Sequence, residues 1–293
     1  MNGIVVINKP LGKTSHDMVY FVRRLTGIKK VGHTGTLDPS ATGVLPVCIG
    51  NATKVCDMLT NADKVYRVSF VLGMTTDTLD ADGEILTEQP VLVSEEEIRK
   101  AVFSFVGDIV QIPPMYSAIK VNGKKLYELA RQGISVERKE RHVTIKNIDI
   151  LDIDMEKFVV TMDVDCSKGT YIRTLCEDIG MKLKCGAYVN SLERRKSGIF
   201  SIDESFTLEK LQEIKEQGGL EEILKAPDSL FSEYPEIKVT ERQSGLVKNG
   251  VRIRYKGLND GCLYRLYDPE GEFLAISRFV EGELVLEKPF WNR

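Results

Sequence analysis

Alternation of apolar and polar residues predicts strands at several places along the chain. Over 64–72, every second residue from Tyr66 onward is apolar, which is typical of a half-buried strand. The same period of two recurs over 158–166. Short apolar runs at 4–7 and 44–49 are typical of buried strands. The chain is therefore expected to contain a substantial amount of β-sheet.

Helical periodicity predicts amphipathic helices between these strands. Ser15–Thr26 places apolar residues on one face and is followed by a glycine, which is a stop signal for a helix. Ser94 and Glu97 form a capping box in front of another helix. Further helices are predicted at 52–62, 172–183 and 208–216, the first with Val55, Met58, Leu59 and Ala62 on its buried face.

The pattern changes near the end of the chain. A linker-like stretch covers 226–235, and the residues after it contain short apolar runs separated by Asn-Gly, Asp-Gly and Glu-Gly turns. We therefore place a domain boundary near Tyr234. A larger domain is expected at 1–233 and a small all-β module at 234–293.

Composition excludes several classes of protein. No apolar run approaches the length of about 18 residues that a membrane span needs. The opening residues, MNGIVVINKP, lack a basic segment ahead of an apolar run, so we expect no signal peptide and no membrane association. Six cysteines without a CxxC pair and three histidines argue against a zinc site and a disulfide framework. Reduced thiols in a cytoplasm are the simple interpretation.

Charge is distributed unevenly, although the formal net charge is only −3. Eight acidic residues and no basic ones occur over 77–97, whereas basic residues predominate over 9–30, 120–146 and 182–196. The three basic stretches could converge into one phosphate-binding face, with the acidic residues on the far side. Alternatively, each stretch is an ordinary solvated surface, because charge patterning alone is a weak signal.

Candidate chemistry is concentrated in the segment GHTGTLDPSATG at 32–43, which we expect to be a loop. Its glycines allow the backbone to come close to a ligand, and it carries a single carboxylate, Asp38, just before Pro39. In other contexts such an aspartate is most often a turn or cap residue. The sequence contains no phosphate-binding glycine loop, nucleophile elbow or histidine pair at helical spacing.

A carboxylate near a flat aromatic ligand needs an opposite charge to stay ionised, and Arg173 could supply it. Arg173 could equally be a surface residue or a phosphate contact. Tyr66, Tyr171 and Leu192 are consistent with core positions, and His33 with a hydrogen-bonding loop residue.

Several segments, taken together and in order, resemble the motifs of the TruB-type tRNA pseudouridine-55 synthases. NKPLGKTS at 8–15, followed by Arg23 and Arg24, and the segment at 32–43 resemble the first two motifs. KVYR at 64–67 resembles the tyrosine motif and SKGTYIRTL at 167–175 the arginine motif. LERR at 192–195, with Ser197 and Gly198, resembles a further segment of the family. The insertion that starts with QIPPMYSAIK at 111–120 resembles the family's RNA-binding thumb. The tail resembles an RNA-binding PUA-like domain.

The resemblance implies an α+β fold with a mixed or antiparallel sheet. It implies a catalytic domain at 1–233 that carries a thumb at about 112–140, and a PUA-like domain at 234–293. It also implies an activity: isomerisation of uridine to pseudouridine in the T-loop of tRNA, without metal or cofactor. The partner implied is the tRNA T-arm, and we expect a monomer that needs no protein partner.

The resemblance also assigns roles to residues. Asp38 would be the catalytic carboxylate and Arg173 would hold it ionised and aimed. Tyr66 would stack on the extruded base, Tyr171 and Leu192 would wall the pocket, and His33 would contact nearby nucleotides. Attack of Asp38 at C1′, its addition to the base at C6 and its removal of a sugar proton all remain open.

Two alternatives to this enzyme are considered. A non-catalytic RNA-binding protein or tRNA-folding chaperone would explain the basic stretches equally well, but not the co-occurrence of Asp38, Tyr66 and Arg173. A guide-RNA-dependent relative is disfavoured, because the chain has no long basic tail or extra domain.

Overall fold

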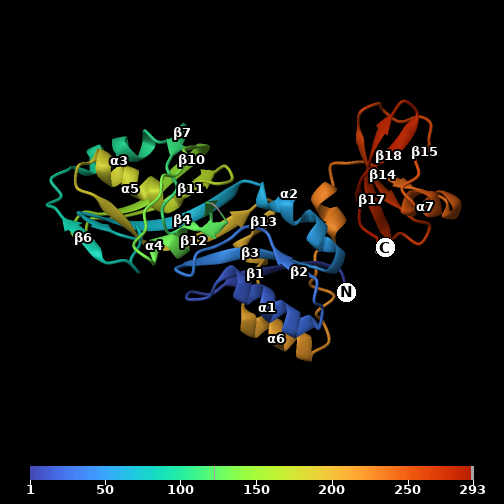
Figure 1. Ribbon diagram of the computed structural model, residues 1–293, viewed down its shortest axis with the longest axis horizontal. Coiled ribbons are helices and arrows are strands. Elements are labelled where there is room, and N and C mark those ends of the chain that lie inside the picture. The colour runs from blue at the N-terminus through green and yellow to red at the C-terminus, as the bar shows by residue number, and fades with distance from the viewer. Residues whose placement is uncertain (122, 292–293) are drawn as a thin grey trace.

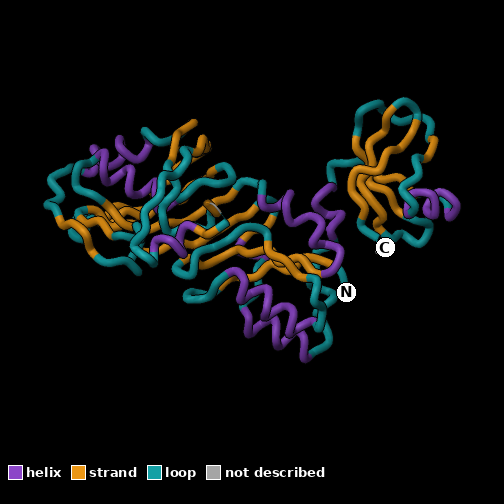
Figure 2. Tube along the Cα trace, in the orientation of Figure 1, coloured by secondary structure: helices purple, strands orange, loops and turns teal. Residues whose placement is uncertain are grey.

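A computed structural model describes residues 1–121 and 123–291 of the chain. A mixed nine-stranded sheet runs through the larger part of the molecule (Figures 1 and 2). Its main path follows the order β1-β3-β12-β4-β11-β10-β7, while β2 pairs with β3 and β13 with β12. Only β12 and β3 are parallel; the other pairs of this sheet are antiparallel in the described residues. The strands are β1 (Gly3–Lys9), β2 (Val31–His33), β3 (Ala41–Ile49), β4 (Lys64–Leu72), β7 (Gly107–Gln111), β10 (Arg141–Asp154), β11 (Val159–Cys166), β12 (Ala187–Ser197) and β13 (Phe200–Ser201). The predicted α+β class with a mixed sheet is confirmed.

The periodic segments form the elements that their patterns predict. β4 covers the predicted 64–72, with Val68, Phe70 and Leu72 buried on one face and Tyr66 partly buried beside them. The first helix, α1 (Ser15–Thr26), begins at a capping box and ends at Gly27, whose left-handed φ of 73° terminates it.

Helices cover the sheet in two groups (Figure 1). α1 and α6 (Leu208–Glu216) lie near β1, while α3 (Glu95–Phe103) and α5 (Ile172–Lys182) lie over the other half of the sheet. Each group covers its own apolar cluster, and Tyr66 and Leu192 border both clusters. These two residues therefore mark the place where the two halves of the sheet meet.

The helix predicted at 52–62 is shorter than expected. A 3-10 turn over Gly50–Val55 leads into α2 (Cys56–Thr60). Met58, expected on the buried face, is exposed, because three residues per turn in the 3-10 segment rotate the helical face. The Lys64 ammonium binds the Thr60 carbonyl at the end of α2, which favours a stop there.

The loop expected at 32–43 is also shorter, and spans 34–40 between β2 and β3. β3 starts as early as Ala41 because it pairs there with Leu192 of β12 as well as continuing beside β1. Gly43, with φ +101°, allows this close approach, since a Cβ there would lie 2.3 Å from the Arg194 carbonyl oxygen.

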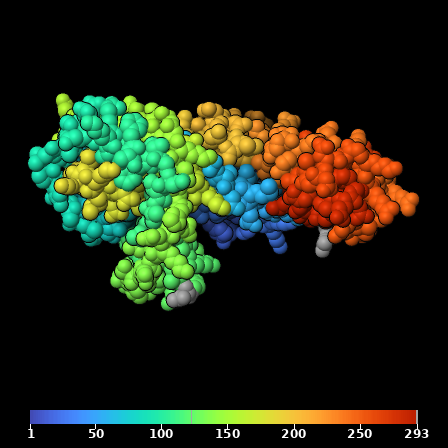
Figure 3. Space-filling view, turned by 90° about the horizontal axis from the view of Figure 1, so that it is seen from above, coloured from blue at the N-terminus to red at the C-terminus, as the bar shows by residue number. Residues whose placement is uncertain are grey.

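The insertion at about 112–140 projects from the body of the molecule, as Figure 3 shows. It contains a two-stranded sheet and a short helix whose Leu126 and Leu129 are buried. A second hairpin lies at the far end of the large sheet from the C-terminal module (Figure 1). These elements are β8 (Lys120–Val121), β9 (Lys124–Lys125), α4 (Leu126–Ala130) and the hairpin β5 (Met74–Thr76) and β6 (Ile85–Glu88).

A five-stranded sheet forms a separate C-terminal module, in the order β14-β16-β17-β18-β15 (Figure 1). The predicted small β module is confirmed, and it also contains a helix that the turn pattern does not indicate. Its elements are β14 (Glu236–Lys238), α7 (Glu241–Lys248), β15 (Ile253–Arg254), β16 (Leu263–Tyr267), β17 (Phe273–Val280) and β18 (Glu283–Pro289). Within the described residues, no helix has the length and apolar character needed to cross a membrane.

Candidate active site

Three hydrogen bonds hold the loop 34–40 in place. The Ser15 hydroxyl, buried at the start of α1, accepts a hydrogen bond from the Leu37 amide at 2.8 Å and donates one to the Leu37 carbonyl at 3.1 Å. The Gly12 amide donates to the Pro39 carbonyl. Asp38 lies between these two anchored positions, so its backbone is fixed on both sides.

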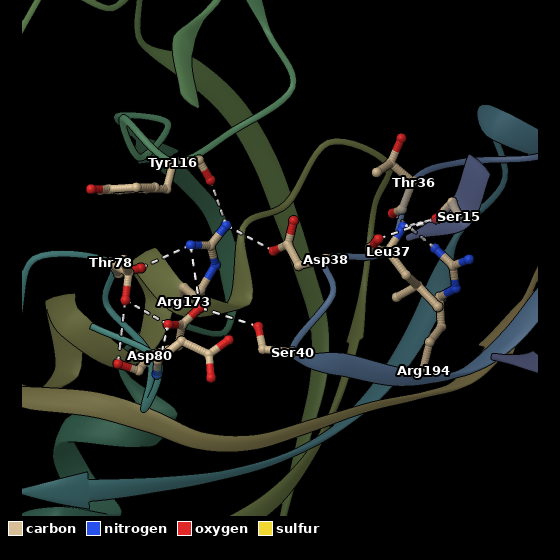
Figure 4. A network of polar contacts seen from close by, with 11 residues as sticks. Ser15, Thr36, Leu37, Asp38, Ser40, Thr78, Asp80, Tyr116, Arg173 and Arg194 are labelled. Carbon is tan, nitrogen blue, oxygen red and sulfur yellow. Dashed lines mark hydrogen bonds and ion pairs between the residues drawn. The ribbon is translucent and has the colours of Figure 1, made fainter. Parts of the chain in front are cut away.

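Asp38 and Arg173 form an ion pair, as the sequence suggests (Figure 4). Arg173 Nη2 lies 2.7 Å from Asp38 Oδ2, and the two residues come from the loop 34–40 and the first turn of α5. The arginine side chain is 5% exposed, whereas the aspartate side chain is 38% exposed. The carboxylate is therefore oriented by a buried partner but remains accessible to a ligand.

The guanidinium of Arg173 is fixed by further contacts. It donates to the Thr78 carbonyl at 2.8 Å and to the Tyr116 carbonyl, in the insertion, at 2.7 Å. Its Nη1 also lies 3.5 Å from Asp80 Oδ2 (Figure 4). A buried guanidinium that is bonded on several sides can hold Asp38 in one orientation.

Asp80 is a site residue that the sequence analysis missed. It belongs to the acidic stretch 77–97; the possibility that this stretch lies on the far side of the molecule does not hold for Asp80. The chain bends back after β5, and the Ala81 amide bonds to the Val189 carbonyl of β12, so that Asp80 reaches Arg173. No local pattern reports such a long-range contact.

A cavity of about 360 Å³ opens beside the ion pair. It is lined by five of the six residues singled out from the sequence: Asp38, Tyr66, Tyr171, Arg173 and Leu192. The tertiary structure thus brings together residues from four separate segments of the chain.

The sixth residue, His33, lies at the end of β2 and lines a neighbouring hollow of about 700 Å³. Asp38 lines both spaces, and Lys125 and Arg131 of the insertion line the second. Burial lowers the pKa of His33, which favours a neutral ring, and no hydrogen-bond partner of its Nδ1 is present among the described residues. Because Nδ1 is itself buried, a ligand in the hollow would have to meet another edge of the ring.

Two tyrosines supply flat walls to the cavity. Burial raises the pKa of both Tyr66 and Tyr171, so that both phenols are neutral near pH 7. The backbone of Tyr171 is bonded twice by the side chain of buried Gln111, from β7. An aromatic ring fixed in this way can stack on a planar ligand.

Two buried cations, Lys64 and Arg194, also line the cavity. Arg194 donates to the Val44 carbonyl at 2.7 Å and, more weakly, to the carbonyls of Gly35 and Thr36 in the loop that carries Asp38. Figure 4 shows the contact with Thr36. Both interpretations of the basic stretch 182–196 predict exposed side chains, which is wrong for Arg194, because this residue is only 1% exposed. Its position opposite Tyr66 on the neighbouring strand decides this burial.

Among the described residues, no group of three or more histidine, cysteine or acidic side chains is arranged to hold a metal ion. The cavity walls instead offer one accessible carboxylate, aromatic faces and cationic groups. This arrangement can hold a planar, polar ring and place a carboxylate against it.

Two family models match adjoining parts of the chain. The family model described as "TruB family pseudouridylate synthase (N terminal domain)" matches residues 23–172. The model described as "tRNA pseudouridylate synthase B C-terminal domain" matches residues 173–232.

Individual proteins give the same result. A protein of Alkaliphilus oremlandii called tRNA pseudouridine synthase B is 50% identical over 285 residues, which cover 97% of this chain and 92% of that protein. One of Clostridium novyi with the same name is 48% identical over 292 residues, covering 98% and 99%. Among solved structures, "Crystal Structure of a Cbf5-Nop10-Gar1 Complex" has a chain that matches with a TM-score of 0.72 and 26% identity, over 99% of this chain and 85% of that one.

Proposed function

Because the chain belongs to the TruB family of pseudouridylate synthases, we propose that it isomerises uridine to pseudouridine at position 55, in the T-loop of tRNA. Pseudouridine synthesis is the activity of the family, and tRNA is the substrate named for relatives that are half identical to this chain. The T-loop position, the catalytic residues and a reaction without cofactor are parts of the proposal.

The ion pair between Asp38 and Arg173 is the observation that carries the proposal. It sets an accessible carboxylate at the edge of a cavity whose other walls include Tyr66, Tyr171 and Leu192. A uracil ring is planar and polar, and it requires this kind of enclosure once it has left the base stack.

In the reaction, the N1–C1′ bond breaks, the uracil turns, and its C5 forms a bond to C1′. The atoms are conserved overall, so the enzyme must mainly hold the base and stabilise charge. Breaking a glycosidic bond gives C1′ the character of an oxocarbenium ion, which a nearby carboxylate stabilises. We assign this position to Asp38, whether it attacks C1′, adds to the base at C6 or removes a sugar proton.

The other residues bind the extruded nucleotide. Tyr66 stacks on the base, a contact worth about 1–3 kcal/mol. Extrusion costs a few kcal/mol, so stacking offsets much of that cost. Tyr171 and Leu192 limit the space in which the base turns, and His33 contacts a nucleotide next to it in the second hollow.

The insertion at about 112–140 serves as the thumb that holds the T-arm. Its Lys125 and Arg131 line the hollow that opens onto Asp38, and Tyr116 at its base is bonded to Arg173. RNA bound against the thumb would therefore be directed toward the site. The small module at 234–293 would contact another part of the tRNA, and we expect the chain to act as a monomer without a protein partner.

Replacement of Asp38 by Asn tests the assignment. Asn keeps the size of the side chain but removes the negative charge, so tRNA affinity should change little while turnover falls by at least about 10³-fold. Tritium release from tRNA that carries 5-³H-uridine measures turnover, and filter binding measures affinity. Asp152→Asn, which changes an exposed carboxylate on β10, is the matched control.

Substantial turnover by Asp38→Asn would contradict the catalytic assignment. Tight tRNA binding without any turnover by the wild-type protein would instead overturn the proposed activity and support a tRNA-folding chaperone.

A further inference from the structure

Lys64 and Arg194 form a pair of buried cations on one face of the large sheet. Lys64 and Tyr66 are two residues apart on β4, so their side chains point to the same face. Arg194 is the direct cross-strand partner of Tyr66 on β12. The two cations therefore flank the tyrosine that forms one wall of the cavity, and both line that cavity themselves.

These cations bond to backbone carbonyls, and Arg194 also contacts the Tyr66 hydroxyl. The Lys64 ammonium donates to the carbonyls of Thr60, at 2.6 Å, and Ala62, and Arg194 donates to three carbonyls. In the part of the chain that the structure describes, neither cation has an ion-pair partner, whereas Arg173 has two carboxylates beside it. Their side chains are only 6% and 1% exposed.

Burying an ion without an opposite charge is costly. Hydrogen bonds to carbonyls compensate the lost hydration but leave the net positive charge in place. Two such charges beside one cavity make its interior favourable for an anion, because the effective dielectric constant of a buried site is low.

A phosphate group and the uracil itself are the two anions that a bound nucleotide could bring. A phosphate would need direct access to the cations, but their side chains are nearly inaccessible and several of their N–H groups already bind carbonyls. Through-space stabilisation of charge on a base held against Tyr66 requires no such access. The uracil is therefore the anion that fits.

We propose that Lys64 and Arg194 stabilise the negative charge that develops on the uracil ring during isomerisation. This inference rests on the proposed function. When the N1–C1′ bond breaks, its electron pair stays with N1 and is delocalised over O2 and O4, while C1′ becomes electron-poor beside Asp38. An electron pair of the ring then forms the C5–C1′ bond, C5 loses its proton, and N1 gains one, so that no oxidant or reductant is needed.

Single-turnover rates of charge variants provide the first test. Arg194→Gln and Lys64→Met should lower the rate of pseudouridine formation by about 10²-fold, the scale found when one preorganised donor is removed. Arg194→Lys, which keeps the charge but loses carbonyl contacts, should retain much more of the rate than Arg194→Gln. Affinity for tRNA should stay within about twofold of wild type, because the cations do not touch the RNA backbone.

A base that leaves C1′ more easily than uracil distinguishes charge stabilisation from a structural role of the two cations. A T-arm stem-loop with a single 5-fluorouridine at the target position carries a base whose anion is stabilised by fluorine. Loss of 5-fluorouridine, measured by nuclease digestion and chromatography, should be several-fold less impaired by Arg194→Gln and Lys64→Met than uridine conversion is. Lys100→Gln, which changes an exposed cation on α3, should have no effect on either substrate.

The pH dependence gives a third measurement. Burial lowers the pKa of Lys64 to about 8, and the charged or titratable groups facing it are Arg194 on β12, Cys166 on β11, Lys168 in the turn before α5 and Asp63 beside it. The ammonium loses its proton above about pH 8, so the wild-type rate should fall there. Lys64→Met should lack this component of the fall.

The outcomes separate this inference from the proposed function. If the wild-type protein converts uridine but Arg194→Lys is as slow as Arg194→Gln, and both substrates are equally impaired, the cations have only a structural role and the inference is wrong. Weakened tRNA binding with an unchanged single-turnover rate would also overturn it. If the wild-type protein converts no uridine, the proposed function itself fails.

Discussion

At the scale of single residues, Arg173 shows how much of the site depends on one buried side chain. Its guanidinium contacts Asp38, Asp80 and the carbonyls of Thr78 and Tyr116, which come from three segments far apart in sequence. Each contact removes a direction in which the guanidinium could rotate. The orientation of Asp38 therefore depends on groups that touch no substrate.

Asp80 is expected to act as a positioning residue through Arg173. Asp80→Asn removes the charge 3.5 Å from Arg173 Nη1 but keeps a group that can bond Thr78. The turnover number should fall by about 10–100-fold with little change in tRNA affinity, because the orientation of Asp38 is loosened while the RNA contacts are kept. Tritium release under saturating tRNA measures this.

Asp152→Asn, at the exposed carboxylate on β10, is again a suitable control for this prediction. An Asp80→Asn enzyme with unchanged turnover, or one that loses tRNA affinity instead, would contradict the positioning role.

At the scale of elements, β4, β12 and the loop 34–40 build the cavity between them. β12 pairs with β4 on one side and with β3 on the other, so residues of both neighbouring strands face the same space. The thumb then covers the site from outside, and its Lys120–Val121 and Lys124–Lys125 strands form a hairpin at its end. The cavity and the hollow beside it are thus built from both the sheet and the projecting insertion.

Charge reversal in this hairpin tests its proposed contact with RNA. Lys124→Glu combined with Lys125→Glu should weaken tRNA binding and reduce the slope of log affinity against log salt by about two, if each lysine neutralises one phosphate. Binding measured at a series of salt concentrations gives both quantities. An unchanged salt slope would show that these lysines make no phosphate contact, and reversal of exposed Lys100 and Lys157 is the matched control.

At the scale of the whole molecule, the C-terminal module is joined to the large sheet through an apolar contact. Phe290 and Ile276 of the module share a buried cluster with Phe231 and with residues of β1 and β3. The rings of Phe231 and Phe290 lie 6.0 Å apart. A single chain connection crosses the boundary near Tyr234, but the two parts also pack against each other through this apolar contact.

Loss of the contact between the C-terminal module and the Phe231 cluster should destabilise the larger domain at 1–233. A chain that ends at residue 233 exposes the Phe231 cluster, so it should unfold at a lower temperature than the full chain.

Phe290→Ala should lower the free energy of unfolding by about 3–5 kcal/mol, whereas Val251→Ala, at an exposed position, should leave it nearly unchanged. Thermal and denaturant unfolding measure these effects, and equal melting temperatures for the short and full chains would show that the parts fold independently.

Local patterns predicted most of the elements, because periodicity reports which face of a segment is buried. Ser15–Thr26 and Leu208–Glu216 form helices with the predicted bounds, and β4 spans the predicted strand. The same reasoning was wrong at Met58, where a 3-10 turn changes the period, and in the length of the loop before β3.

The site divides in the same way. Motifs are local, so they already identify the loop that carries Asp38, the segments that carry Tyr66 and Arg173, and the family. Contacts between distant segments place Asp80 against Arg173 and bury Lys64 and Arg194 beside the cavity, and these contacts exist only in the folded chain. The charges along a sequence do not reveal which charged side chains are buried, because burial depends on the strands and loops that pack around each side chain after folding.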